Sequence, residues 1–338
     1  MSNWKLHFSM IGTLAVIFGL STLVFTVVLT LMDISLSLTT IVVFVIVFSF
    51  AQWMLSPYLV GAVYKVKELG AKENSEMYNV IEQLSIKSKI SPPKLMLAQS
   101  SMPNAFAYGS PLTGNRVAIT QGLLDTLDKG EIEAVIAHEL GHLKHRDVQV
   151  MMTVSFLPTL FYFIGYSLML SGMFGGGRGK SSGGGGNNAL IGIAFTVFSW
   201  VLSIFTLYLS RLREYYADRH SVSIVENGAE KLSTGLVTIV NENKNQRRYR
   251  RASNRGNQKE NNTSFKALFI SDPDKAEAEA KKFYADNDSN NNTSTASNKQ
   301  ELLREALAKK VTGAEKFAEL FATHPNIIKR LKAIQTQA

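Results

Sequence analysis

The feature that most constrains this chain is the presence of four long runs without a charged residue. They cover residues 8–32, 34–64, 148–177 and 187–210. A bilayer core of about 30 Å is crossed by about 20 helical residues, so each run is long enough to span a membrane. Buried helices of soluble proteins usually keep a polar face, and these runs have none. The sequence therefore predicts four transmembrane helices, although packed or shallow helices also fit the last two runs.

The basic residues that flank these runs predict the orientation of the chain. Cytoplasmic ends of membrane spans carry an excess of lysine and arginine, so we expect the N-terminus and both polar regions to face the cytoplasm. The chain has no cysteine, which fits a domain in a reducing compartment. Arg178 and Lys180, in the connection between the third and fourth runs, count against this topology without reversing it. The supporting residues are Lys5, Lys65, Lys67, Arg211 and Arg213.

The runs divide the chain into four parts. Residues 1–64 are expected to form an anchor of two transmembrane helices, and residues 148–210 a transmembrane hairpin with a Gly-rich connection. Residues 65–147 and 211–338 are expected to form the two halves of one polar domain.

The first polar half combines helical and extended patterns. Apolar residues at helical spacing predict one helix over 67–90 and another over about 129–147. Between them, short β-like runs are separated by turn-forming residues, which predicts a small meander. The predicted strands are 94–98, 105–109 and 116–120.

The sequence HELGH at 138–142 carries the chemistry. In a helix, His138 and His142 lie one turn apart on the same face, where two imidazoles can bind one Zn²⁺ at about 2.0–2.1 Å. Glu139 lies beside them without binding the metal, which is the place of a general base for an activated water molecule. The motif therefore predicts a peptidase with one zinc ion per chain.

A catalytic zinc needs three protein ligands and one open position. The metzincin pattern requires a histidine at position 148, and Val148 stands there, so that class is excluded. The sequence REYYAD at 213–218 supplies a glutamate instead. Glu214 and Asp218 are four residues apart on one helical face, so we expect Glu214 to be the third ligand. Asp218 is expected to accept the free N–H of a ligating histidine and fix its tautomer.

Four motifs occur together in this chain: PNAFAYG at 103–109, HELGHLKHRD at 138–147, SRLREYYAD at 210–218 and THP at 323–325. This combination resembles the HtpX-type membrane zinc metalloproteases over essentially the whole chain. The resemblance implies a mainly α membrane protein with four transmembrane helices and a gluzincin-like α+β zinc protease domain carrying a small β-sheet. It also implies an endopeptidase on the cytoplasmic face of the cell membrane, acting in quality control of misfolded membrane proteins.

The resemblance implies roles for three further residues. His324, in the THP motif, is expected near the zinc as a catalytic donor to the tetrahedral oxyanion, although an exposed histidine at a helix start is also unremarkable. Arg330, on the same predicted helix, is expected to support that charge. Asn104 opens a strand beside the cleft, where a peptide substrate can add through backbone hydrogen bonds. Asn104 and Arg330 are thus the expected substrate-binding residues.

Two polar segments are relevant to which partners the chain binds. Residues 242–264 are basic and contain few apolar residues, so a solvated loop is expected, with attraction to anionic lipid headgroups as the alternative. Nucleic-acid binding is not expected, because no aromatic platform accompanies the arginines. Residues 286–299 are a second low-complexity segment. The expected partners are polypeptide substrates and the lipid bilayer.

Three alternatives fit parts of the sequence. A site-two-type intramembrane protease would carry its motif inside a span, whereas acidic residues precede HELGH and start its helix in water. CAAX prenyl proteases resemble this chain in the HExxH motif and the downstream glutamate, but they carry more spans. A catalytically silent membrane scaffold would be expected to lack a ligand or Glu139, and none is lacking.

Overall fold

The computed structural model describes residues 38–70, 74–174, 184–253 and 296–337. The predicted span at 8–32 lies outside the described residues, as do 175–183 of the Gly-rich connection and most of the low-complexity segment 286–299. The chain forms two compact units. One comprises residues 1–48 and 156–199, and the other comprises residues 49–155 and 200–338.

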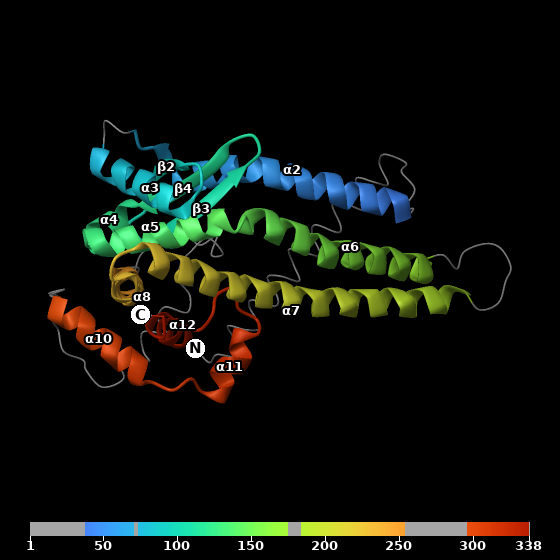
Figure 1. Ribbon diagram of the computed structural model, residues 1–338. Coiled ribbons are helices and arrows are strands. Elements are labelled where there is room, and N and C mark those ends of the chain that lie inside the picture. The colour runs from blue at the N-terminus through green and yellow to red at the C-terminus, as the bar shows by residue number, and fades with distance from the viewer. Residues whose placement is uncertain (1–37, 71–73, 175–183, 254–295, 338) are drawn as a thin grey trace. The chain divides into compact units, whose positions relative to one another are not determined.

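Three long helices of the described chain match predicted spans. They are α2 (Leu38–Tyr64), α6 (Asp147–Phe174) and α7 (Gly184–Ile224), drawn in blue, green and yellow in Figure 1. By length and composition, each contains a segment able to cross a membrane. These segments are Val42–Tyr64, Asp147–Gly172 and Asn188–Ile224. Three of the four predicted membrane helices are therefore confirmed as long apolar helices.

In the first unit, α6 and α7 approach each other closely at two glycines. A Cβ added to Gly165 would lie 2.7 Å from the Gly192 carbonyl oxygen, so no larger residue fits there. The Ser199 hydroxyl donates to the Pro158 carbonyl across the same pair, at 2.7 Å. Close approach through small residues and interhelical hydrogen bonds is typical of helix packing in membranes.

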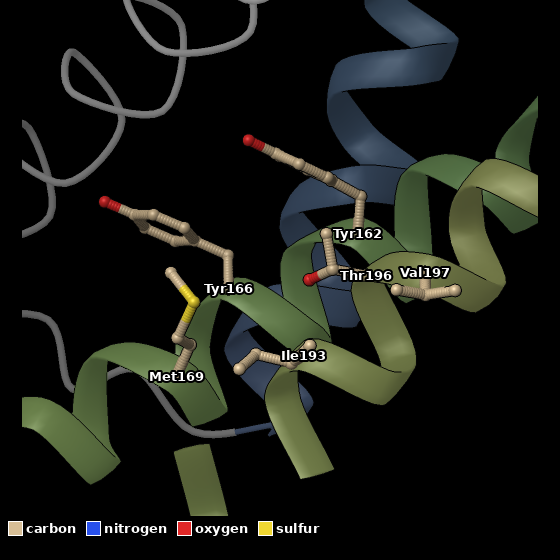
Figure 2. A pocket seen from close by; sticks show the side chains of 6 residues that line it. All are labelled: Tyr162, Tyr166, Met169, Ile193, Thr196 and Val197. Carbon is tan, nitrogen blue, oxygen red and sulfur yellow. The ribbon is translucent and has the colours of Figure 1, made fainter. Parts of the chain in front are cut away.

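A cavity of about 260 Å³ lies between α6 and α7 (Figure 2). Its lining is almost wholly apolar and aromatic and contains no acidic residue or histidine, so it cannot hold the predicted zinc site. The lining residues are Tyr162, Tyr166, Met169, Ile193, Thr196 and Val197.

The second unit contains a four-stranded sheet in the order β1-β2-β4-β3. β2 pairs parallel to β4, with Leu95 opposite Val117, and β3 pairs antiparallel to β4, with Ala107 opposite Val117. β3 therefore forms one edge of the sheet. The predicted meander is wrong, because β4 lies between β2 and β3 and runs parallel to β2. The strands are β1 (Lys67–Glu68), β2 (Lys94–Ala98), β3 (Ala105–Ser110) and β4 (Gly114–Thr120), which confirms the three predicted strands.

The helix predicted over 67–90 is wrong in its first third, residues 67–74. Lys67–Glu68 forms β1, and the Leu69 amide donates to the Leu95 carbonyl at 2.9 Å, so these backbone groups belong to the sheet. The helix α3 (Ser75–Ser88) begins after Asn74, whose side chain accepts a hydrogen bond from the Met77 amide. This N-cap fixes the start of the helix at that point.

The helix with the HELGH motif lies in the core of the second unit. A capping box starts it: the Asp128 carboxylate accepts from the Glu131 amide at 2.9 Å, and the Glu131 carboxylate accepts from the Asp128 amide at 3.1 Å. Ile136 is fully buried in one apolar cluster with Leu236 and Leu331. The remaining helices are α4 (Gln121–Thr126), α5 (Lys129–Lys144), α8 (Gly228–Ser253), α10 (Ala296–Ala308), α11 (Gly313–Glu319) and α12 (Ile327–Gln335).

The basic segment expected as a loop at 242–264 is helical in its first half, because α8 continues to Ser253. Asn243 is fully buried, and the Gln246 amide group donates to the Ser101 carbonyl at 2.7 Å, so this part of the helix is anchored on the sheet side of the unit. Arginine and glutamine are also good helix formers. The loop expectation is therefore wrong for 242–253.

Candidate metal centre

Helix α5 brings the two motif histidines together. The Nε2 atoms of His138 and His142 lie 3.2 Å apart, and His138 is fully buried. Together with Glu139, they form a group whose ligand atoms all lie within 4.8 Å of one another. Gly141, the glycine of the motif, allows α5 to pack closely against α7, because a Cβ at this position would lie 3.0 Å from the Cα of Ala217.

Helix α7 places Glu214 opposite the histidines. Its Oε2 lies 3.7 Å from His138 Nε2, and its Oε1 lies 3.6 Å from His142 Nε2. Donors bound tetrahedrally to zinc at about 2.0–2.1 Å are roughly 3.3–3.4 Å apart, close to the separations found here. Glu214 Oε2 is also buried, and within the described part of the chain it forms an ion pair with Arg330 Nη1 at 3.2 Å but no hydrogen bond. The residues present therefore fit a zinc ion.

A carboxylate behind His138 fixes its ring. Asp218 Oδ1 lies 2.9 Å from His138 Nδ1, which puts the ring proton on Nδ1 and leaves the lone pair that a ligand needs on Nε2. Arg330 Nη2 lies 3.2 Å from this Nε2. Arg330 donates to both oxygens of Asp218 at 2.7 Å, and its Nη1 forms an ion pair with Glu214 Oε2 at 3.2 Å. Burial and the nearby Arg330 charge lower the pKa of His138, which favours the neutral imidazole that a metal requires. Asp218 thus lies beside the ring of His138.

A second carboxylate, which sequence reasoning missed, lies behind His142. Asp147 Oδ2 is 2.6 Å from His142 Nδ1 and 3.0 Å from Arg213 Nε. Burial alone would lower the pKa of His142, but Asp147 and the Glu214 carboxylate raise it above its usual value. Asp147 is the first residue of α6, five positions after His142. The aspartate at the end of HELGHLKHRD was the feature of the sequence that could have indicated this carboxylate.

Glu139 points toward the edge strand β3. Its Oε2 accepts a hydrogen bond from the Ala107 amide at 2.8 Å. Burial raises the pKa of Glu139 to about 7. A bound cation nearby would oppose that shift, because it favours the ionised carboxylate. Glu139 is therefore close to the metal ligands and is held by the strand expected to meet the substrate.

The other three predicted site residues, His324, Arg330 and Asn104, lie in different surroundings. His324 Nδ1 lies 3.4 Å from Glu214 Oε1, so the ring stands beside the proposed metal ligands. Arg330 is 1% exposed and forms ion pairs with Glu214 and Asp218, so it is buried within the site. Asn104 is also 1% exposed, and its backbone amide donates to Thr120 Oγ1 at 2.9 Å, just before β3.

Comparison with known proteins identifies the family of this chain. Residues 71–338 match Peptidase family M48. The Protease HtpX homolog of Thermoplasma acidophilum is 34% identical over 292 residues, which cover 86% of this chain and 82% of that protein. The Protease HtpX homolog of Aeropyrum pernix is 42% identical over 188 residues, or 56% of this chain and 58% of that protein.

A solved structure shares the fold. The crystal structure of S. mikatae Ste24p has a TM-score of 0.57 and covers 98% of this chain, while this chain covers 65% of Ste24p. Because the two are only 18% identical, the likeness shows the fold alone.

The long apolar helices and the His–Glu–His group define a membrane metalloprotease. The chain belongs to peptidase family M48, and the resemblance to HtpX-type proteases is confirmed.

Proposed function

We propose that this chain is a zinc-dependent endopeptidase whose metal is held by His138, His142 and Glu214. The observation that carries the proposal is the convergence of these side chains from α5 and α7, with donor atoms 3.2–3.7 Å apart. Bound there, zinc would supply a Lewis acid that lowers the pKa of water and polarises a peptide carbonyl.

The surrounding residues prepare the ligands. Asp218 and Asp147 accept the Nδ1 protons of the two histidines and hold both rings with Nε2 toward the metal. Arg330 pairs with Asp218 and Glu214, so it compensates two buried carboxylates. We therefore assign Arg330 a positioning role, in place of the substrate contact implied by the resemblance.

Glu139 is the proposed general base. Its carboxylate takes a proton from the water molecule that attacks the peptide carbonyl and later gives it to the leaving amine. The Ala107 amide holds this carboxylate in place. His324, whose Nδ1 lies 3.4 Å from Glu214 Oε1, is the proposed donor to the oxyanion that forms at the carbonyl.

The substrate is proposed to bind as an extended strand along β3. This strand lies at the edge of the sheet and contacts Glu139 through Ala107, so a peptide paired with it would pass the base. Asn104, buried at the start of β3, would set the position of that edge. Membrane proteins undergoing quality control at the cytoplasmic face of the cell membrane are the proposed substrates, on the strength of the HtpX-type relatives.

A CAAX-prenyl-protease-like activity is the second candidate function. The Ste24p fold is consistent with it, but a likeness at 18% identity does not outweigh the HtpX homologues at 34% and 42%. The scaffold alternative is not favoured, because every proposed ligand and Glu139 are brought together.

Digestion of casein by the purified protein tests the proposal. A chelator should abolish cleavage, and stoichiometric zinc should restore it, because the proposed chemistry depends on a removable metal. Cleavage that continues unchanged after the protein has lost its zinc would contradict the proposed function.

A further inference from the structure

Three large apolar side chains are exposed together next to the metal centre. Phe317, Leu320 and Phe321 are 65%, 42% and 53% exposed, and they form what we call the apolar patch. Their spacing of three and four residues puts them on one face of α11 and the turn that follows it. The two phenylalanine rings pack edge to face, with centroids 5.6 Å apart.

Hydrogen bonds tie the patch to the end of a membrane helix. Arg211 Nη1 donates to the carbonyls of Leu320 and Ala322, at 3.3 and 2.8 Å. Arg211 is the first charged residue after the apolar run 187–210 of α7. Its guanidinium also lies 5.7 Å from the ring centroid of Tyr208, which is 52% exposed. The patch is therefore fixed where α7 changes from apolar to charged.

That position is where a bilayer surface is expected. Tyrosine at the end of a span lies at the level of the headgroups, and the first arginine beyond it marks the aqueous side. Amphipathic helices with phenylalanine and leucine on one face and lysine nearby lie in this interface, with the apolar face about 5–10 Å into the boundary with the acyl chains. Here the nearby lysines are Lys309, Lys310 and Lys316.

We propose that the apolar patch inserts into the lipid surface of the bilayer and attaches the C-terminal part of the second unit to the membrane. The attachment acts on the segment that enters the metal centre, since His324 follows Phe321 by three residues. Arg211 holds one end of that segment, and Glu319 accepts from the Asn326 amide at 3.1 Å at the other. The site would thus be held at the membrane surface by lipid contacts as well as by α7.

The full chain contains no cysteine, so a single fluorophore can be placed on it. Phe317→Cys should be labelled with an environment-sensitive dye, and the protein placed as one copy per nanodisc of phosphatidylcholine and phosphatidylglycerol. Nitroxide lipids, labelled close to the headgroup, should remove most of the fluorescence, whereas aqueous iodide should remove little.

Ile86→Cys is the matched control, because Ile86 is 70% exposed but far from the proposed surface. Its neighbour Lys87 donates to the carbonyl of Ile224. Ile224 lies fourteen residues beyond Ser210 in α7, a distance of about 21 Å along the helix. Iodide should quench the fluorescence of the dye at this position, and the nitroxide lipids should not.

Replacing Leu320 and Phe321 by serine should move the dye at Phe317→Cys from lipid to water, so that iodide quenching increases. The Ile86→Cys reporter in the same double variant should not change, which shows that the fold is kept. Strong iodide quenching of Phe317→Cys in the otherwise unaltered chain overturns the proposal. Protection from both quenchers also overturns it, because protein rather than lipid then covers the patch. These measurements do not depend on peptidase activity.

Discussion

At the residue scale, each histidine proposed to bind zinc has its own carboxylate. Asp218 orients His138 from α7, and Asp147 orients His142 from the start of α6. Each carboxylate is in turn paired with an arginine, Arg330 for Asp218 and Arg213 for Asp147. Such partners fix the tautomer and increase the basicity of the ligand, so both contribute to metal affinity.

Removing Asp147 tests this interpretation. Asp147→Ala should weaken zinc binding by about 10–100-fold, because the His142 ring loses the acceptor that orients it. Competition with a chelating dye measures the affinity. Asp125→Ala, which removes an exposed carboxylate bonded to Gln121, is the control and should bind zinc normally. Equal affinities of the two variants would show that Asp147 does not support the ligand.

At the element scale, the site depends on how closely α5 and α7 approach. Gly141 lies against Ala217, one turn from Glu214, so the backbone contact sets the distance between the histidines and the third ligand. In the same region, the Ser221 hydroxyl donates to the Ala134 carbonyl at 2.6 Å. The two helices are therefore held together by close packing and by a hydrogen bond.

Gly141→Ala should separate these helices by a few tenths of an ångström. In an open helix this change would stabilise the protein by up to about 1 kcal/mol, but overpacking should instead destabilise it by about 1–3 kcal/mol and weaken zinc binding. Unfolding in detergent and zinc titration measure the two effects. Gly313→Ala, where an added Cβ meets nothing within 4 Å, is the control. An increase in stability for Gly141→Ala would contradict the close-approach argument.

The elements also show what the sequence could predict. Helical spacing was enough to place His138 and His142 on one face, and to put Glu214 and Asp218 on another. Local pattern could not show that 67–69 joins the sheet, since that depends on pairing with residues 26 to 30 positions later in the chain. Local pattern also could not predict the contacts of Arg330, because the partners of this residue on α7 are about 112 residues away in the chain.

At the scale of the whole molecule, membrane helices supply part of the metal centre directly. The helix α7 carries Glu214 and Asp218 only a few residues beyond its apolar run, and α6 starts with Asp147. The second unit therefore needs the ends of both helices to complete its site. This arrangement suits an enzyme whose substrates are at the membrane, which is the proposed setting.

The central claim is that Glu139 performs proton transfer while other residues hold the metal. Glu139→Gln keeps the size of the side chain and removes its charge, so the purified protein should still bind one zinc ion with near-normal affinity. Casein hydrolysis should fall by about 10²–10⁴-fold, the usual contribution of general acid–base catalysis. Zinc content and turnover should be measured on the same preparation, beside His138→Ala, which should lose both. Near-normal turnover of zinc-loaded Glu139→Gln would contradict the account.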